Sequence, residues 1–119
     1  MRKEAMTLRT LATKLGLSVQ AGDSRLDREV SGGYASDLLS CVMARARKGN
    51  VWVTLQCHLN VVAVATLLDL AGIIITEGAA PDAAMLAKAS EEGLPVLTTS
   101  KTTYTVVGEL TGLGIRGEE

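Results

Sequence analysis

A short aliphatic strand, a polar loop and a helix follow one another three times along this chain. The strand segments span residues 51–55, 73–76 and 95–99, and the helical patterns that follow them span 60–71, 82–92 and 102–113. Strands linked by helical crossovers lie parallel, because each crossover returns the chain to the same edge of the sheet. The pattern therefore predicts an α/β domain of three layers, in which a mainly parallel sheet is flanked by helices.

Small polar side chains stand at the ends of these strands. Gln56, Thr76 and Thr98 each close or follow an apolar run. The carboxyl ends of parallel strands meet at one edge of the sheet, which is where open α/β sheets bind ligands. We therefore expect a binding site at this carboxyl edge, although the sequence says much less about its ligand.

The first part of the chain is predicted to add further elements to the same sheet. They are a helix at 8–15 capped by Thr7, strands at 17–21 and 29–34, and a helix from Ser36 and Asp37 to Lys48. Gly32 and Gly33 are expected to break the second strand, and the basic end of the second helix suits the helix dipole. We expect a single domain across residues 1–119, ordered from about residue 7 to about residue 115, with residues 1–6 loose and 116–119 frayed.

The composition is that of a globular domain with few aromatic groups. Of the 119 residues, 47% are hydrophobic, and the formal net charge is −1. A nucleic-acid binder normally carries a basic face and stacking rings, so we expect no nucleic-acid partner. The longest apolar stretch, 61–68, is too short to cross a bilayer, and no signal-peptide pattern is present, so we expect no membrane partner. We therefore expect a cytoplasmic protein with Cys41 and Cys57 reduced.

The helix predicted at 60–71 is apolar on nearly every side. A helix on the face of a sheet needs only one apolar stripe, so the rest of its surface must be covered. In so small a domain we expect a second copy of the chain to cover it, which would make a homodimer. The alternative is a central helix that is covered by its neighbours in the same chain.

His58 is the only histidine, and it lies between a strand and a helix. A histidine that contacts a ligand would lie at such a position. The alternative is that Asn60 caps the helix and His58 only forms a hydrogen bond within the loop. No nucleophile and base can be assembled around His58 by spacing, and Cys57 is expected to be a small buried thiol. Two cysteines and one histidine at this spacing match no zinc pattern, so we expect no metal and no other cofactor.

Two further segments offer groups that could bind an anion. One is a glycine-rich turn before a helix, formed by Gly32, Gly33, Tyr34, Ser36 and Asp37. Its backbone N–H groups could hold a phosphate, or the segment could be a simple bend. The other is 98–103, where hydroxyls and Lys101 could bind a phosphate, or Ser100 or Thr102 could cap the helix. The residues alone leave both alternatives open.

Taken together, these motifs resemble the DRTGG domain family over nearly the whole chain. The resemblance rests on 30–40, 49–56, His58, 60–65, 73–76, Pro81, Asp82 and 93–96. It implies a sheet domain like the N-terminal domain of HPr kinase/phosphorylase. Related domains occur in phosphotransacetylases and beside CBS domains, where they are auxiliary, non-catalytic and often at oligomer interfaces.

We therefore expect a regulatory or ligand-sensing module without catalytic activity. The ligand class favoured by the resemblance is a nucleotide or another small phosphorylated molecule, because the family sits beside nucleotide-sensing domains. The expected ligand-binding residues are Gly32, Gly33, Tyr34, Ser36, Asp37, Gln56, His58, Asn60, Thr76 and Thr98. One alternative is a structural dimerisation module that recruits a partner enzyme and binds no small molecule. Another is an enzyme of small phosphorylated metabolites with His58 as acid–base.

Overall fold

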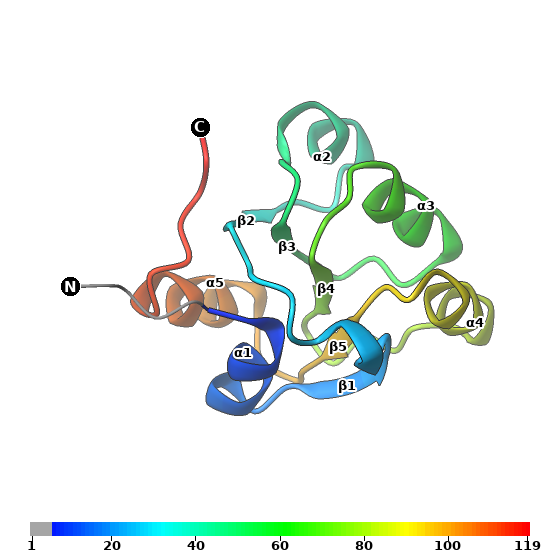
Figure 1. The fold of residues 1–119 in the computed structure, drawn as a ribbon, viewed down its shortest axis with the longest axis horizontal. Coiled ribbons are helices and arrows are strands. Elements are labelled where there is room, and N and C mark those ends of the chain that lie inside the picture. The colour runs from blue at the N-terminus through cyan, green and yellow to red at the C-terminus, as the bar shows by residue number, and fades with distance from the viewer. Residues whose placement is uncertain (1–5) are drawn as a thin grey trace.

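The computed structural model describes residues 6–119, and Figure 1 shows its fold. The strands are β1 (Ser18–Ala21), β2 (Gly32–Ala35), β3 (Asn50–Thr54), β4 (Gly72–Ile75) and β5 (Val96–Thr98). The helices are α1 (Leu8–Leu15), α2 (Leu39–Arg45), α3 (Leu59–Leu67), α4 (Ala83–Glu92) and α5 (Thr103–Gly112), with a short 3-10 turn η1 (Asp23–Arg25).

The strands form one sheet in the order β1-β5-β4-β3-β2. β2, β3, β4 and β5 run parallel, and β1 pairs antiparallel with β5 at one edge. The predicted architecture is thereby confirmed, because the helical crossovers do return each strand to the same edge.

Helices cover both faces of the sheet, as Figure 1 shows. Val51 and Val53 belong to the core cluster under α1 and α5, whereas Trp52 between them belongs to the cluster under α2, α3 and α4. Successive side chains of a strand point to opposite faces, so one apolar run supplies both cores. This is why β3 and β4 are apolar without alternation.

Two helices have the local end signals that the sequence predicts. Thr7 accepts a hydrogen bond from the Thr10 N–H at the start of α1, and Asp82 accepts one from the Met85 N–H at the start of α4. Gly16 and Gly93 end these helices in the left-handed conformation. Caps of this kind depend on neighbours in the sequence, so the pattern reveals them.

α2 is shorter than the predicted helix, which was expected from Ser36 to Lys48. The Asp37 carboxylate accepts hydrogen bonds from the Thr54 hydroxyl (2.7 Å) and the Leu55 N–H (2.9 Å), so it binds β3 instead of capping the helix. After Arg45 the chain becomes extended. Gly32 and Gly33 do not break β2 either, since both pair in register with β3.

Residues 116–119, which were expected to fray, form hydrogen bonds with the rest of the domain. The Gly33 N–H donates to the Arg116 carbonyl oxygen (2.9 Å), and Arg47 Nε donates to the Glu118 carbonyl oxygen (2.8 Å), so this segment lies along the β2 edge. At the other end, residues 1–5 lie outside the described residues. Met6, which was also expected to be loose, accepts a hydrogen bond from the Val30 N–H.

One face of α3 is covered by its own chain. Val61, Val62, Val64 and Ala65 are buried, in a core cluster shared with α2 and α4. Leu59 and Leu67 remain 46% and 70% exposed. The alternative interpretation therefore holds for the buried face of the helix, and the opposite face is left exposed. None of the helices in the described part of the chain has the length and hydrophobicity that crossing a membrane requires.

Candidate functional site

The carboxyl ends of the central strands meet at one edge of the sheet, as predicted. Ile75 of β4 pairs with Thr54 on one side and with Thr98 on the other. The Thr76 N–H donates to the Thr54 carbonyl oxygen (3.1 Å), which continues the same edge. The shared rim is thus confirmed, and what occupies it can be examined group by group.

On the β2 and β3 side of this rim, the polar groups bind one another. The Asp37 carboxylate accepts hydrogen bonds from the Thr54 hydroxyl and the Leu55 N–H, and Gln56 Nε2 donates to the Asp37 carbonyl oxygen (2.9 Å). The Ser36 hydroxyl accepts a hydrogen bond from the Leu38 N–H (3.1 Å). These residues connect β2 to β3, and their hydrogen bonds explain why such polar groups stand at the strand ends.

At the β4 end, the groups that could hold a phosphate are also engaged. The Thr76 and Thr103 hydroxyls share a hydrogen bond (2.6 Å), and the Glu77 carboxylate accepts one from the Thr103 N–H (2.8 Å). A carboxylate thus already stands at the N-terminus of α5, where an anion is favoured. Lys101 Nζ contacts the Glu109 carboxylate (2.9 Å) on the other side of the segment.

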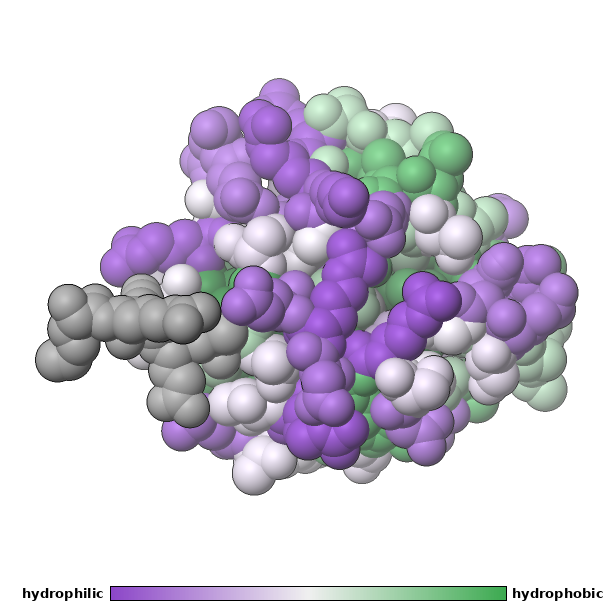
Figure 2. All heavy atoms as spheres, viewed as in Figure 1, coloured by the Kyte–Doolittle hydropathy of each residue, from purple (hydrophilic) through white to green (hydrophobic). Residues whose placement is uncertain are grey.

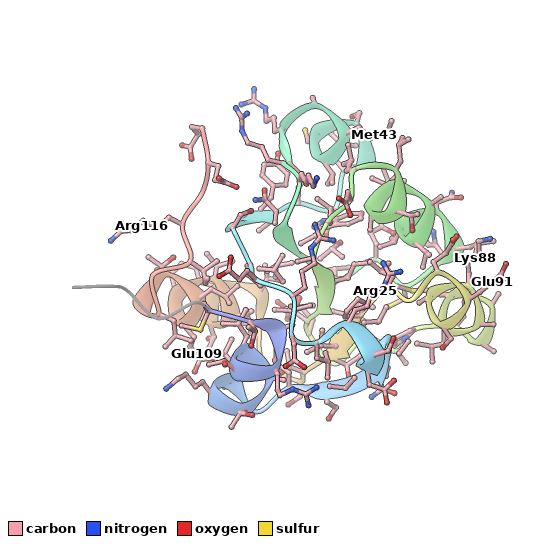
Figure 3. The ribbon with its side chains drawn as sticks, viewed as in Figure 1. Arg25, Met43, Lys88, Glu91, Glu109 and Arg116 are labelled. Carbon is pink, nitrogen blue, oxygen red and sulfur yellow. The ribbon has the colours of Figure 1, made fainter. Side chains whose placement is uncertain are left out.

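Of the two interpretations of 98–103, the structure shows the capping one. Thr102 accepts a hydrogen bond from the Thr105 N–H at the start of α5. Figure 3 shows Glu109, the partner of Lys101, on α5 beside α1. A phosphate in this segment would therefore have to displace existing partners.

His58 and Asn60 lie on the surface at the start of α3. His58 occupies the N-cap position but makes no capping hydrogen bond through its side chain. Burial, and then the negative charge of Asp82, raise the pKa of the neighbouring Cys57 thiol, so the thiol stays protonated and is a weak nucleophile. Within residues 6–119, no cluster of three His, Cys, Asp or Glu side chains could hold a metal ion.

A cavity of about 550 Å³ opens at the rim beside β5 and β1. Of the expected site residues it includes only Thr98, which shares its lining with Ser18, Gln20, Gly78 and Ser100. Hydroxyl and amide groups predominate there. The structure therefore does not gather the ten expected residues into one cavity.

A larger hollow lies away from the rim, where the end of α2 faces the C-terminal segment. This tail cleft has a volume of about 650 Å³ and is lined by Tyr34, 44–47, Asn50 and 117–119. Tyr34 is the only expected site residue in its lining. Gly32 and Gly33 lie beneath the C-terminal segment, in the amino half of β2. They allow this segment to approach the strand closely, and they do not lie at the carboxyl edge of the sheet.

The cationic groups of the tail cleft were not predicted as site residues. Arg45 ends α2, and neither Arg45 nor Arg47 forms an ion pair with a carboxylate among the described residues. The Asn50 side chain is buried, accepts a hydrogen bond from the Arg47 N–H (2.9 Å) and donates one to Glu118 Oε1 (2.5 Å). The basic run at 45–48 was visible in the sequence, but helix-dipole compensation explained it equally well.

Comparison with protein families decides what kind of domain this is. The family model described as DRTGG domain matches residues 10–113. This chain belongs to the DRTGG domain family. No curated protein sequence gives a significant match to it.

A solved structure shares the fold of this DRTGG domain. It contains the CBS and DRTGG domains of the regulatory region of Clostridium perfringens pyrophosphatase, complexed with an activator, diadenosine tetraphosphate. The match has a TM-score of 0.70 at 15% sequence identity, and it covers 86% of this chain but only 44% of that one. At this identity the likeness establishes the α/β fold, and the present DRTGG domain spans less than half the length of its neighbour.

Proposed function

We propose that this DRTGG domain is a regulatory module without catalytic activity that binds a small phosphorylated molecule, with a nucleotide as the favoured class. One support is the structurally similar pyrophosphatase fragment. Its DRTGG domain belongs to the regulatory region of an enzyme, and that region was solved in complex with a dinucleotide activator. We further propose that the ligand signal reaches a partner enzyme. The free thiols Cys41 and Cys57 agree with a cytoplasmic location.

The observation that carries the ligand proposal is the chemistry of the tail cleft. Arg45 and Arg47, which have no carboxylate partner within residues 6–119, line the same cavity as the Tyr34 ring. A guanidinium group binds phosphate oxygens through paired hydrogen bonds, and an aromatic ring stacks on a nucleobase. Lys101 lines the cavity beside β5 and β1, but its Nζ forms an ion pair with the Glu109 carboxylate (2.9 Å). The tail cleft therefore suits a phosphorylated ligand better.

The lining of the tail cleft also supports a role in binding instead of catalysis. Its polar side chains are Tyr34, Arg45, Arg47, Asn50, Glu118 and Glu119, with no serine, cysteine or histidine among them. Covalent catalysis needs a nucleophile next to a base. His58 lies on another part of the surface, so turnover that His58→Ala abolishes would favour the enzyme interpretation instead.

Removing Arg45 is expected to weaken nucleotide binding about tenfold, which corresponds to about 1.4 kcal/mol. ATP titrated into the wild type and Arg45→Ala by calorimetry measures this effect. Lys14→Ala is the matched control, because Lys14 is an exposed cation at the end of α1. Equal affinities of the wild type and Arg45→Ala would show that the cleft is not the site.

A thermal-shift screen tests the proposed function as a whole. A ligand at about one hundred times its dissociation constant raises the free energy of unfolding by about 2.7 kcal/mol. For a domain of this size, the melting temperature should then rise by about ten degrees. Nucleotides, acyl phosphates and sugar phosphates form the screen. An unmoved melting curve with all of them would favour the alternative of a dimerisation module that binds no small molecule.

One surface supports that alternative and also the homodimer, which we propose in either case. The α2–α3 surface consists of Leu38, Met43, Leu59 and Leu67, each between 46% and 70% exposed. Figure 2 shows hydrophobic groups gathered over α2 and α3, and Figure 3 shows Met43 there. α3 carries no charged residue, so two copies could meet across a twofold axis without opposing like charges.

Leu67→Lys is expected to convert a dimer into a folded monomer, because Leu67 is 70% exposed and a lysine there reaches water. Light scattering at micromolar concentration gives the mass, and circular dichroism reports the fold. Val62→Lys is the contrasting variant, since Val62 is fully buried and a lysine there should unfold the domain. A wild type with the mass of one chain would refute the dimer.

A further inference from the structure

We propose that the C-terminal segment is a built-in competitor for the tail cleft, with Glu118 standing where the anionic group of a ligand would bind. This inference rests on the proposed function, because it concerns how the same site is regulated. It goes further by assigning a second state to the domain, in which the segment has left the cleft and the ligand has entered.

Glu118 already uses the groups that an anion would use. Its carboxylate accepts hydrogen bonds from Asn50 Nδ2 (2.5 Å) and the Ser31 hydroxyl (3.2 Å), and its carbonyl oxygen accepts one from Arg47 Nε (2.8 Å). A phosphate on Asn50 and Arg47 would stand against the Glu118 carboxylate. Two anions in direct contact repel each other, so the phosphate and the Glu118 carboxylate cannot both bind Asn50 and Arg47.

The segment reaches the cleft because β2 begins with glycine. A Cβ on residue 32 would lie 2.7 Å from the Arg116 carbonyl oxygen and 2.8 Å from Glu118 Cγ. The Gly33 N–H then donates to the Arg116 carbonyl oxygen. Ile115 is buried and anchors the start of the segment, whereas residues 116–119 are all exposed.

Such a segment can be displaced without unfolding the domain. Beyond Ile115 it is held by hydrogen bonds that water can replace, and Figure 3 shows the Arg116 side chain pointing away from the fold. While the segment is bound, Glu118 occupies Asn50 and Arg47, so a phosphate cannot bind these two groups, and the apparent affinity falls by the fraction of molecules in which the segment has left. Releasing the segment should therefore tighten ligand binding.

Two variants release the segment by different means. Glu118→Ala removes the competing carboxylate, and Gly32→Ala blocks the close approach sterically without touching either arginine. Their matched controls are Glu91→Ala, which removes an exposed carboxylate on α4 outside the cleft, and Gly108→Ala, because a Cβ on Gly108 meets nothing within 4 Å. Calorimetry with ATP is expected to give a dissociation constant about fivefold lower for both release variants and within about twofold of wild type for both controls.

The results separate this inference from the proposed function. If the wild type binds ATP and neither release variant binds it more tightly, the competitor is refuted while the ligand proposal stands. If the wild type and all four variants show no binding, both proposals fail. A second measurement uses the wild type alone. Saturating ATP should accelerate hydrogen exchange of the Gly33 amide, which loses the Arg116 carbonyl, and unchanged exchange upon binding would overturn the competitor.

Discussion

Trp52→Ala is expected to lower the free energy of unfolding by about 4 kcal/mol. Trp52 lies in the inner strand β3, is fully buried and packs in the core cluster under α2, α3 and α4. Its Nε1 donates to the Ser36 carbonyl oxygen (2.9 Å), so the variant loses apolar packing and also leaves that oxygen without its partner. Urea denaturation followed by circular dichroism measures the loss, because the variant contains no tryptophan for fluorescence.

Trp52→Phe separates the two contributions. Phenylalanine keeps most of the ring volume but cannot donate to Ser36, so a loss of about 1–2 kcal/mol is expected. A loss below about 1 kcal/mol for Trp52→Ala itself would contradict the buried position of the side chain.

Gly22→Ala is expected to lower the free energy of unfolding by about 4 kcal/mol, whereas Gly16→Ala is expected to lower it by about 1 kcal/mol. Both glycines have a left-handed backbone, with φ of 73° and 68°. A Cβ on Gly22 would overlap the Leu94 carbonyl carbon and the Pro95 nitrogen, which are backbone atoms that cannot rotate away. A Cβ on Gly16 meets nothing within 4 Å, so only the backbone strain remains.

Denaturant midpoints of the two variants against the wild type test this difference. Gly16→Ala is the control for Gly22→Ala, because the two glycines have the same backbone conformation and differ only in the atoms around them. Equal losses would mean that the turn after β1 does not press against the connection from α4 to β5.

The elements that local signals define could be predicted from the sequence. Thr7, Gly16, Asp82 and Gly93 mark helix ends, and each acts on backbone groups within a few residues of itself. The apolar runs of β3 and β4 predicted buried parallel strands for the same reason. The prediction failed where a polar residue has a partner that is distant in the sequence. Asp37 does not begin the helix as expected, because its carboxylate accepts hydrogen bonds from the Thr54 hydroxyl and the Leu55 N–H at the end of β3.

The candidate site shows the same division. Tyr34 was expected at the site, and it does line the tail cleft, but its neighbours there come from the end of α2, the start of β3 and the C-terminal segment. Arg45 and Arg47 carried no distinctive spacing, because any helix end attracts basic residues. Gly32 and Gly33 suggested an anion-binding turn, and only the position of Arg116 shows why residues without side chains stand there.

By itself, the sequence determined the parallel sheet, its helical cover and the rim where the strand ends meet, because hydrophobic periodicity and caps are properties of contiguous residues. Only the tertiary structure decided which polar groups at that rim satisfy one another and where cations remain available. Long-range hydrogen bonds such as those from Asn50 and Arg47 to Glu118 depend on which segments the packed core brings together, and no short stretch of sequence records that geometry.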